Sequence, residues 1–264
     1  SWNGALYYYI DDENLELITC PWNGSISTRE LSFWYPKVKV TAIGADAFKN
    51  HRNLTSIEIP KTVKTIGQSA FQYAGKDMSG FDVTFEDESQ LTTIGQSAFQ
   101  ESNVESINLP SELKSIGTKA FYQCGKLTTI VLPTSLSTVG SSAFQSCGNL
   151  TTVNLPASLT SIGERAFSGC NKLETLTFAE NYESGLEINN YAFYNCKLSN
   201  TVEVKPGVTK IGDHAFDWSD DFRTQGQMKT FRVPSTVTSY GDNVVYRTVK
   251  VLYKLNLSFG NTDL

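Results

Sequence analysis

The sequence predicts a right-handed solenoid of mixed α/β class. One face is expected to carry a parallel β-sheet, the other face short helical or 3₁₀ turns and short strands, and both ends β-rich caps. Three observations predict this fold: a six-residue pattern recurs along the chain, a short alternating segment precedes most copies, and most copies start 22 or 23 residues apart. A period of this kind marks a solenoid, because one repeat buries its core only against its neighbours.

The recurring pattern is Ile or Val, then Gly, two variable residues, Ala and Phe. Seven copies lie at Ile43–Phe48, Ile66–Phe71, Ile94–Phe99, Ile116–Phe121, Val139–Phe144, Ile162–Phe167 and Ile211–Phe216. An eighth copy, Ile188–Phe193, carries Asn189 in place of the glycine. Tyr240 and Gly241 begin a decayed ninth copy. Chance does not produce this many copies in register, so the chain repeats one structural unit.

Residues 124–146 show how the first half of a unit is built. In the stretch LTTIVLP, Ile130 and Leu132 alternate with outward-facing residues, which is the period-two pattern of a short strand. Pro133 is expected to end that strand, because proline has no N–H to donate to a ladder. The strands of successive units therefore predict a parallel sheet with neighbours about 4.8 Å apart.

The second half of the unit turns the chain back toward the core. Leu136 and Val139 are expected to point inward. Gly140 is expected to permit a tight turn or a backbone conformation that other residues resist. The following residues predict a helical or 3₁₀ turn in which Ala143 is small enough to lie under a neighbour and Phe144 fills the core.

These residues, L-x-x-I-x-L-P followed by L-x-x-I-G-x-x-A-F, resemble the BspA-like leucine-rich repeats, also called the Treponema-type class. Both halves of the motif recur in register over about residues 38–245, with full units starting at Leu54, Val104, Leu127 and Leu150. The resemblance implies an α/β leucine-rich-repeat solenoid in a secreted or surface-anchored bacterial protein. It also implies partners such as host extracellular-matrix proteins or other cells.

We predict one solenoid domain over residues 1–264, with about nine repeats of ~23 residues in 38–245. Residues 1–37 are assigned to an N-terminal cap and residues 246–264 to a C-terminal cap, because a solenoid must cover its open ends. The aromatic residues Tyr8, Trp22, Trp34 and Trp218 have two interpretations. Those near the N-terminus pack within the cap, or the four residues form an exposed platform on which sugars stack.

Composition and charge exclude several classes of partner. The hydrophobic fraction of 40% supports a packed core, and the net charge of −5 argues against nucleic acid and anionic membranes. No apolar run approaches the ~20 residues that a membrane-spanning helix needs. We expect a monomer without a cofactor. The sequence shows no signal peptide or anchor, so any such segment is expected outside these residues.

Four of the five cysteines occupy one position of the repeat, three residues after the phenylalanine: Cys124, Cys147, Cys170 and Cys196. The equivalent residue in other repeats is usually small, and in one case it is His51. Buried free thiols that act as small hydrophobic groups are therefore the favoured interpretation. A disulfide remains an alternative interpretation, because neighbouring cysteines in the column are close enough to form one. The parallel direction of their side chains argues against it. Cys20 lies in the cap, without a partner in the repeats.

Neither catalysis nor metal binding is supported. His51 and His214 lie about seven repeats apart, so they cannot share a site with a nucleophile and an acid. The zinc spacings C-x₂-C and H-x₃-H are absent. Acidic clusters such as residues 217–221 lack the regular spacing of a calcium loop and are interpreted as solvated turns. We expect no catalytic residues and no metal site.

The outward-facing positions of the predicted strands are the best binding candidates. They are Thr129, Val131, Thr152, Asn154, Thr175, Thr177, Thr201 and Glu203. Threonine is common in strands, so β-propensity alone explains part of the pattern. The other interpretation is a broad hydrogen-bonding surface. It has no aromatic or arginine anchor at its centre, so binding there is expected to be weak or multivalent.

The sequence therefore favours a non-enzymatic recognition or adhesion module at the bacterial cell surface, binding an extracellular protein. Two alternatives stay open. The first is a glycan-binding surface protein, which predicts a patch of exposed aromatic residues. The second is a structural spacer within a larger surface protein, which predicts no ligand.

Overall fold

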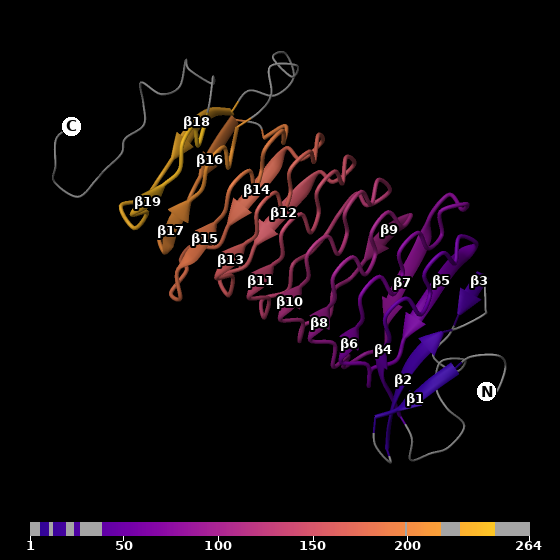
Figure 1. Ribbon diagram of the computed structural model, residues 1–264. Helices are drawn as coiled ribbons and strands as arrows, with labels where there is room; N and C mark the ends of the chain where they lie inside the picture. Colours follow the sequence, from indigo (N-terminus) through magenta and orange to yellow (C-terminus); the bar gives the residue numbers. More distant parts are fainter. Residues whose placement is uncertain are drawn as a thin grey trace, which may run out of the picture.

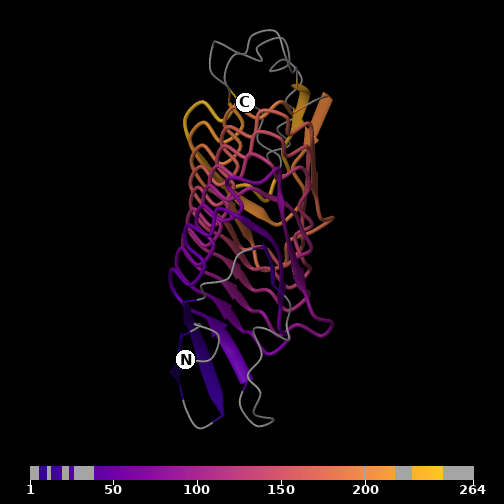
Figure 2. The same ribbon diagram turned by 90° about the vertical axis from the view of Figure 1, so that its right-hand side faces the viewer.

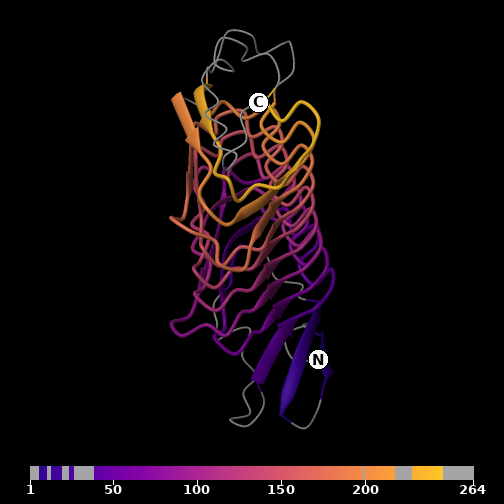
Figure 3. The same cartoon turned by 90° about the vertical axis from the view of Figure 1, so that its left-hand side faces the viewer.

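The computed structural model describes residues 6–10, 13–19, 24–26, 39–198, 200–217 and 228–245. Over these residues the chain winds a β-solenoid whose turns stack along one axis, as three views show (Figures 1, 2 and 3). This confirms the predicted solenoid with parallel sheets. Cys20, Trp22, Trp34, Trp218 and the C-terminal cap lie outside the described residues, as does the side chain of Tyr8. The repeat count, the handedness and the cap boundaries stay predictions.

The longest sheet is formed mainly by the two-residue segments before the repeated glycine. Its eleven strands are, in spatial order, β1 (Leu6–Tyr9), β2 (Asn14–Thr19), β4 (Lys39–Ile43), β6 (Thr65–Ile66), β8 (Thr93–Ile94), β10 (Ser115–Ile116), β11 (Thr138–Val139), β13 (Ser161–Ile162), β15 (Leu186–Ile188), β17 (Val208–Ile211) and β19 (Ser239–Tyr240). All neighbours pair parallel except β1 and β2, which form an antiparallel hairpin at the N-terminal end.

A second row of strands runs along another face of the solenoid, and it is interrupted (Figure 1). It consists of a four-stranded sheet of β3 (Gly24–Ile26), β5 (Leu54–Ile59), β7 (Phe81–Phe85) and β9 (Val104–Ile107), and of two pairs, β12 (Thr152–Leu155) with β14 (Thr175–Phe178) and β16 (Asn200–Glu203) with β18 (Met228–Arg232).

The strand predicted within residues 127–133 is not formed, although Ile130 and Leu132 are buried as expected. Proline helps to explain why the strand pairing on this face is interrupted. Pro110, Pro133 and Pro156 end the segments of successive repeats and supply no N–H. Each ladder is therefore short. The prediction of one continuous sheet on this face is wrong, and the continuous sheet is the one made of short strands.

A stack of phenylalanine rings runs through the core, with one ring from each turn. Its members are Phe48, Phe71, Phe99, Phe121, Phe144, Phe167, Phe193 and Phe216. Neighbouring ring centroids lie 4.9–5.2 Å apart, and the planes differ by at most 13°. Phe144 is fully buried, as predicted. The stack joins the turns directly, since each ring contacts the ring before it and the ring after it.

The segment after each glycine is a turn, and the helical or 3₁₀ conformation predicted for it is not shown. The N–H groups of Ser142 and Phe144 donate to carbonyl oxygens of the next turn, each at 2.7 Å. Ser142 also has a φ of 56°, in the left-handed region that interrupts a right-handed helix. The same conformation recurs at Asp46, Ser69, Ser97, Lys119, Arg165, Tyr191, His214 and Asn243. No helix occurs among the described residues, because bonds between turns use N–H groups that a helix would need.

Replacing Ser142 with valine is expected to lower the free energy of unfolding by about 1 kcal/mol, because a β-branched side chain resists the left-handed region. The matched variant Ser142→Gly relieves that constraint and is expected to unfold at no lower urea concentration than the parent. Urea unfolding followed by circular dichroism measures both. Equal midpoints for the valine and glycine variants would show that the turn does not hold this conformation in solution.

Gly140 serves close packing between turns, a role that the sequence did not predict. It also begins a turn, because the N–H of Ala143 donates to its carbonyl oxygen at 3.2 Å, whereas the predicted unusual backbone conformation is wrong. Its φ is not in the left-handed region. A Cβ built there would lie 2.6 Å from the carbonyl carbon of Gly117 and 2.6 Å from the amide nitrogen of Thr118. Such distances are not compatible with an unshifted backbone. The glycines of the repeated pattern allow successive turns of the long sheet to lie within hydrogen-bonding distance, and we call them the glycine column: Gly44, Gly67, Gly95, Gly117, Gly140, Gly163, Gly212 and Gly241.

Candidate functional site

Six of the eight predicted face residues lie on three strands that follow one another along the solenoid. They are Thr152 and Asn154 on β12, Thr175 and Thr177 on β14, and Thr201 and Glu203 on β16. In the ladder, Thr152 pairs with Thr175 and Asn154 pairs with Thr177. β14 also contacts β16. The structure thus brings these six residues onto one surface.

This surface is polar, and we call these six residues the threonine face. All of them are exposed except Thr152, which is half-buried. The Thr177 hydroxyl is in direct contact with Oδ1 of Asn154. Charge gathers at the C-terminal end, where Glu203 lies opposite Arg232 in the ladder and 3.4 Å from Nζ of Lys205. The surface therefore offers hydroxyl and amide groups along most of its length.

Thr129 and Val131 are separated from this ladder. Both are exposed, but they lie in the segment that forms no strand. Val131 has an exposed fraction of 64%, which is unusual for an aliphatic side chain in this protein. Their part in binding stays a prediction.

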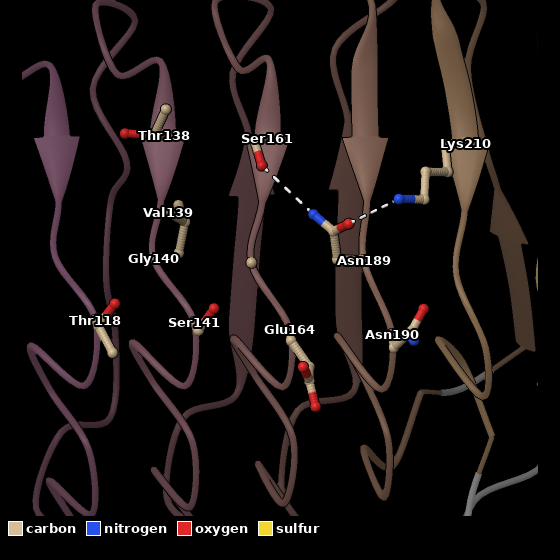
Figure 4. A pocket seen from close by; sticks show the side chains of 11 residues that line it. Thr118, Thr138, Val139, Gly140, Ser141, Ser161, Glu164, Asn189, Asn190 and Lys210 are labelled. Atoms are coloured by element: carbon tan, nitrogen blue, oxygen red, sulfur yellow. Dashed lines mark hydrogen bonds between the residues drawn. The ribbon is translucent and has the colours of Figure 1, made fainter.

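A shallow groove of about 500 Å³ lies on the eleven-stranded sheet, over the glycine column (Figure 4). Gly140 and Gly163 contribute backbone atoms to its lining. Hydroxyl groups of Thr118, Thr138, Ser141 and Ser161 line it, together with the amides of Asn189 and Asn190 and the charged side chains of Glu164 and Lys210. The groove thus spans several turns and is mostly polar.

The side chain of Asn189 stands across this groove in a fixed position. Its Nδ2 donates to the carbonyl oxygen of Ile162 at 2.9 Å and lies 3.5 Å from Oγ of Ser161. Its Oδ1 accepts from Nζ of Lys210 at 3.1 Å. Figure 4 shows this side chain between the two neighbouring turns. Asn189 replaces a repeated glycine, so it interrupts the open column at this turn.

The prediction of the binding face did not include the groove residues. The sequence did contain a signal, because Asn189 is the residue that departs from the glycine of its pattern. What the sequence could not show is which side of the short strand faces solvent and how deep the surface is there. Both depend on the packing of one turn against the next.

The four cysteines of the repeat are buried, unpaired thiols, as the favoured interpretation predicted. Each Sγ donates to a phenylalanine carbonyl of a preceding turn, as Cys147 does to Phe121 at 3.0 Å. Ser102 continues the column, with Oγ 3.6 Å from Sγ of Cys124. Burial raises the pKa of the Cys124 thiol from 9.0 to about 12 and raises the pKa of Cys147 and Cys170 as well. The burial and the hydrogen bonds of these thiols fit a structural role.

Cys124 is expected to make the protein less stable as the pH rises from about 9 toward 12. Its thiol is neutral in the folded protein up to its raised pKa, whereas the unfolded chain ionises near pH 9. The stability that the buried neutral thiol contributes is therefore fully present below pH 9. It is lost as the pH rises through the pKa of Cys124 in the folded protein, which is about 12. Urea unfolding at several alkaline pH values, with Cys124→Ala as the control, measures the difference. An identical pH dependence in both proteins would contradict the assignment.

The two histidines lie in separate turns of the solenoid and have different surroundings. His214 lies with Nδ1 2.8 Å from Oδ2 of the buried Asp217, and its ring stacks on Tyr191 at 4.9 Å. His51 packs edge-on against Phe48. Across the described ranges, no group of three or more His, Cys, Asp or Glu side chains is arranged to hold a metal ion. The described ranges also contain no helix with the length and apolarity to cross a membrane.

Comparison with known proteins identifies relatives of this fold. The chain matches the family model for the BspA type leucine-rich repeat region, in six copies, over residues 27–83, 92–223 and 186–263. It is similar to the T. pallidum leucine-rich repeat protein, with 25% identity, a TM-score of 0.58, and coverage of 69% of this chain and 87% of that one. A leucine-rich repeat protein from Bacteroides ovatus shares the fold, with 22% identity, a TM-score of 0.60, and coverage of 94% and 68%. No curated protein matches the sequence.

Proposed function

This chain belongs to the family of BspA-type leucine-rich repeat proteins, and from that premise we propose that it is a non-enzymatic recognition module that binds a protein partner at the bacterial cell surface. The proposed partner is a host matrix or cell-surface protein. The proposed binding surface is the threonine face. The family supports the class of function, and the exposed polar side chains of the threonine face support the choice of surface.

The observation that carries this proposal is a set of two cross-strand pairs, Asn154 with Thr177 and Thr152 with Thr175, in which all members except the half-buried Thr152 are exposed. Strands β12 and β14 carry hydrogen-bond donors and acceptors at paired positions of the ladder. A partner protein would therefore contact a regular array of polar side chains. Such an array lacks large hydrophobic anchors, and these usually provide most of the binding energy. Several weak contacts or several copies of the module would supply the affinity instead.

The threonine face is tested by Thr175→Arg. The exposed position accepts a long side chain without disturbing the core, but the arginine would block an approaching protein. Binding to immobilised matrix proteins, measured by surface plasmon resonance, is expected to weaken about tenfold or more. Thr65→Arg, at an exposed position of the long sheet, is the matched control and is expected to bind like the parent.

Two results would contradict the proposal. If the parent protein binds no member of a broad panel of matrix and cell-surface proteins, the spacer interpretation replaces it. If Thr175→Arg and Thr65→Arg bind equally well, the partner does not use the threonine face.

A further inference from the structure

We infer that the groove over the glycine column is a second binding site, separate from the threonine face, and that its ligand is a neutral oligosaccharide lying along the solenoid axis. This inference does not depend on the proposed protein partner, because the two surfaces belong to different sheets. It rests on the shape, the charge balance and the free hydroxyl groups of the groove.

The shape of the groove fits an extended ligand. Part of its lining is backbone, contributed by Gly140 and Gly163. Asn189 puts a side chain into the same column one turn further on, and its three polar contacts hold that side chain in place. The groove is thus a trough with one built end wall. Its volume of about 500 Å³ suits a few sugar rings.

The charges of the groove are balanced within the protein. Nζ of Lys210 lies 3.7 Å from Oε2 of Glu187, and the carboxylate of Glu164 is in direct contact with the guanidinium of Arg165. A charged ligand would therefore find no unpaired opposite charge at these positions. This favours a neutral ligand over an anionic glycan, a phosphate or a basic peptide.

Free hydrogen-bonding groups distinguish a sugar from an apolar ligand. The hydroxyls of Thr118, Thr138 and Ser141 line the groove and make no hydrogen bond with other groups in the described ranges. Val139 is the one aliphatic side chain among the lining residues, and only 1% of it is exposed. Hydroxyl groups that both donate and accept match the hydroxyl groups of a sugar.

An extended peptide is less well matched to this surface. A peptide usually gains affinity by adding a strand to a free sheet edge. The strands that flank the groove, β11 and β13, each already have a neighbour on both sides. A peptide would be left with side-chain contacts alone, and the groove has no apolar pocket to anchor one.

The groove also departs from a common mode of sugar recognition, in which an aromatic ring stacks on the sugar. Tyr191 lies next to the groove residue Asn190, but its faces are taken by Arg165 at 4.6 Å and His214 at 4.9 Å. Binding must therefore come from hydrogen bonds, which are each worth little in water. We expect a weak interaction for one module, strengthened where several modules are displayed together.

The test is a glycan array with neutral and anionic oligosaccharides, followed by calorimetric titration of the best neutral oligosaccharide. The double variant Thr138→Ala, Ser141→Ala removes two free hydroxyls from the surface and leaves the core intact. It is expected to weaken binding about tenfold. Asn189→Gly restores the glycine of the repeat, removes the end wall and is expected to weaken binding to a similar extent. Thr175→Ala, on the threonine face, is the matched control and is expected to bind like the parent.

Three outcomes would overturn the inference. The parent may bind no neutral oligosaccharide on the array, or it may bind only anionic ones. Alternatively, the double variant and Asn189→Gly may both keep the parent affinity while remaining folded by circular dichroism. None of these outcomes bears on the protein partner, because that proposal is tested by Thr175→Arg against matrix proteins.

Discussion

Replacing Phe144 with alanine is expected to lower the free energy of unfolding by about 4 kcal/mol. The ring is fully buried and stacks on Phe121 and Phe167, with both centroids 5.0 Å away. Its removal leaves a cavity and breaks two aromatic contacts, which connect the turn to both of its neighbours. Urea unfolding of the full chain, followed by circular dichroism, measures the change.

Two comparisons make the result specific. Phe121→Ala should cost a similar amount, because Phe121 occupies the equivalent position and stacks in the same way. Val131→Ala, at a side chain that is 64% exposed, should change stability by less than about 0.5 kcal/mol. A loss below about 1 kcal/mol for Phe144→Ala would show that the ring is not part of a packed core.

Gly140→Ala is the second large effect, and it acts on the backbone. The added methyl group would lie 2.6 Å from two backbone atoms of the preceding turn, at Gly117 and Thr118. Backbone atoms cannot rotate away as a flexible side chain can, so the turns must separate. The free energy of unfolding is expected to fall by about 3 kcal/mol, although alanine is usually the better residue for the unfolded state.

Gly148→Ala provides the matched control for this prediction. Gly148 is a glycine near the start of the next repeat, and a Cβ built there meets nothing within 4 Å. This variant is expected to be as stable as the parent or slightly more stable. Equal stability of Gly140→Ala and Gly148→Ala would mean that the turns do not approach as closely as the structure shows.

These two predictions place the stability of the fold in contacts between neighbouring turns. The phenylalanine stack joins the turns in the core, and the glycine column lets the backbones of the long sheet approach. The side chains that the binding tests change belong to neither feature. The variants Thr175→Arg and Thr138→Ala with Ser141→Ala are therefore expected to alter binding without unfolding the protein.

The sequence predicted the repeating unit and much of the core because both depend on local pattern. Ile130, Leu132, Phe144 and the cysteine column are buried as their spacing indicates. The alternation of inward and outward residues also predicted that Asn154 and Thr177 face solvent. It did not predict the left-handed turn at Ser142, because that turn is maintained by hydrogen bonds to the next repeat.

By itself, the sequence determined the family, the period of the repeat and which side chains enter the core, since these follow from residues close together in the chain. Only the tertiary structure decided which of the two rows of strands forms a continuous sheet and where the surface is hollow. The physical reason is that both depend on the distance between successive turns. That distance is set by contacts such as Gly140 against Gly117, between residues 23 positions apart.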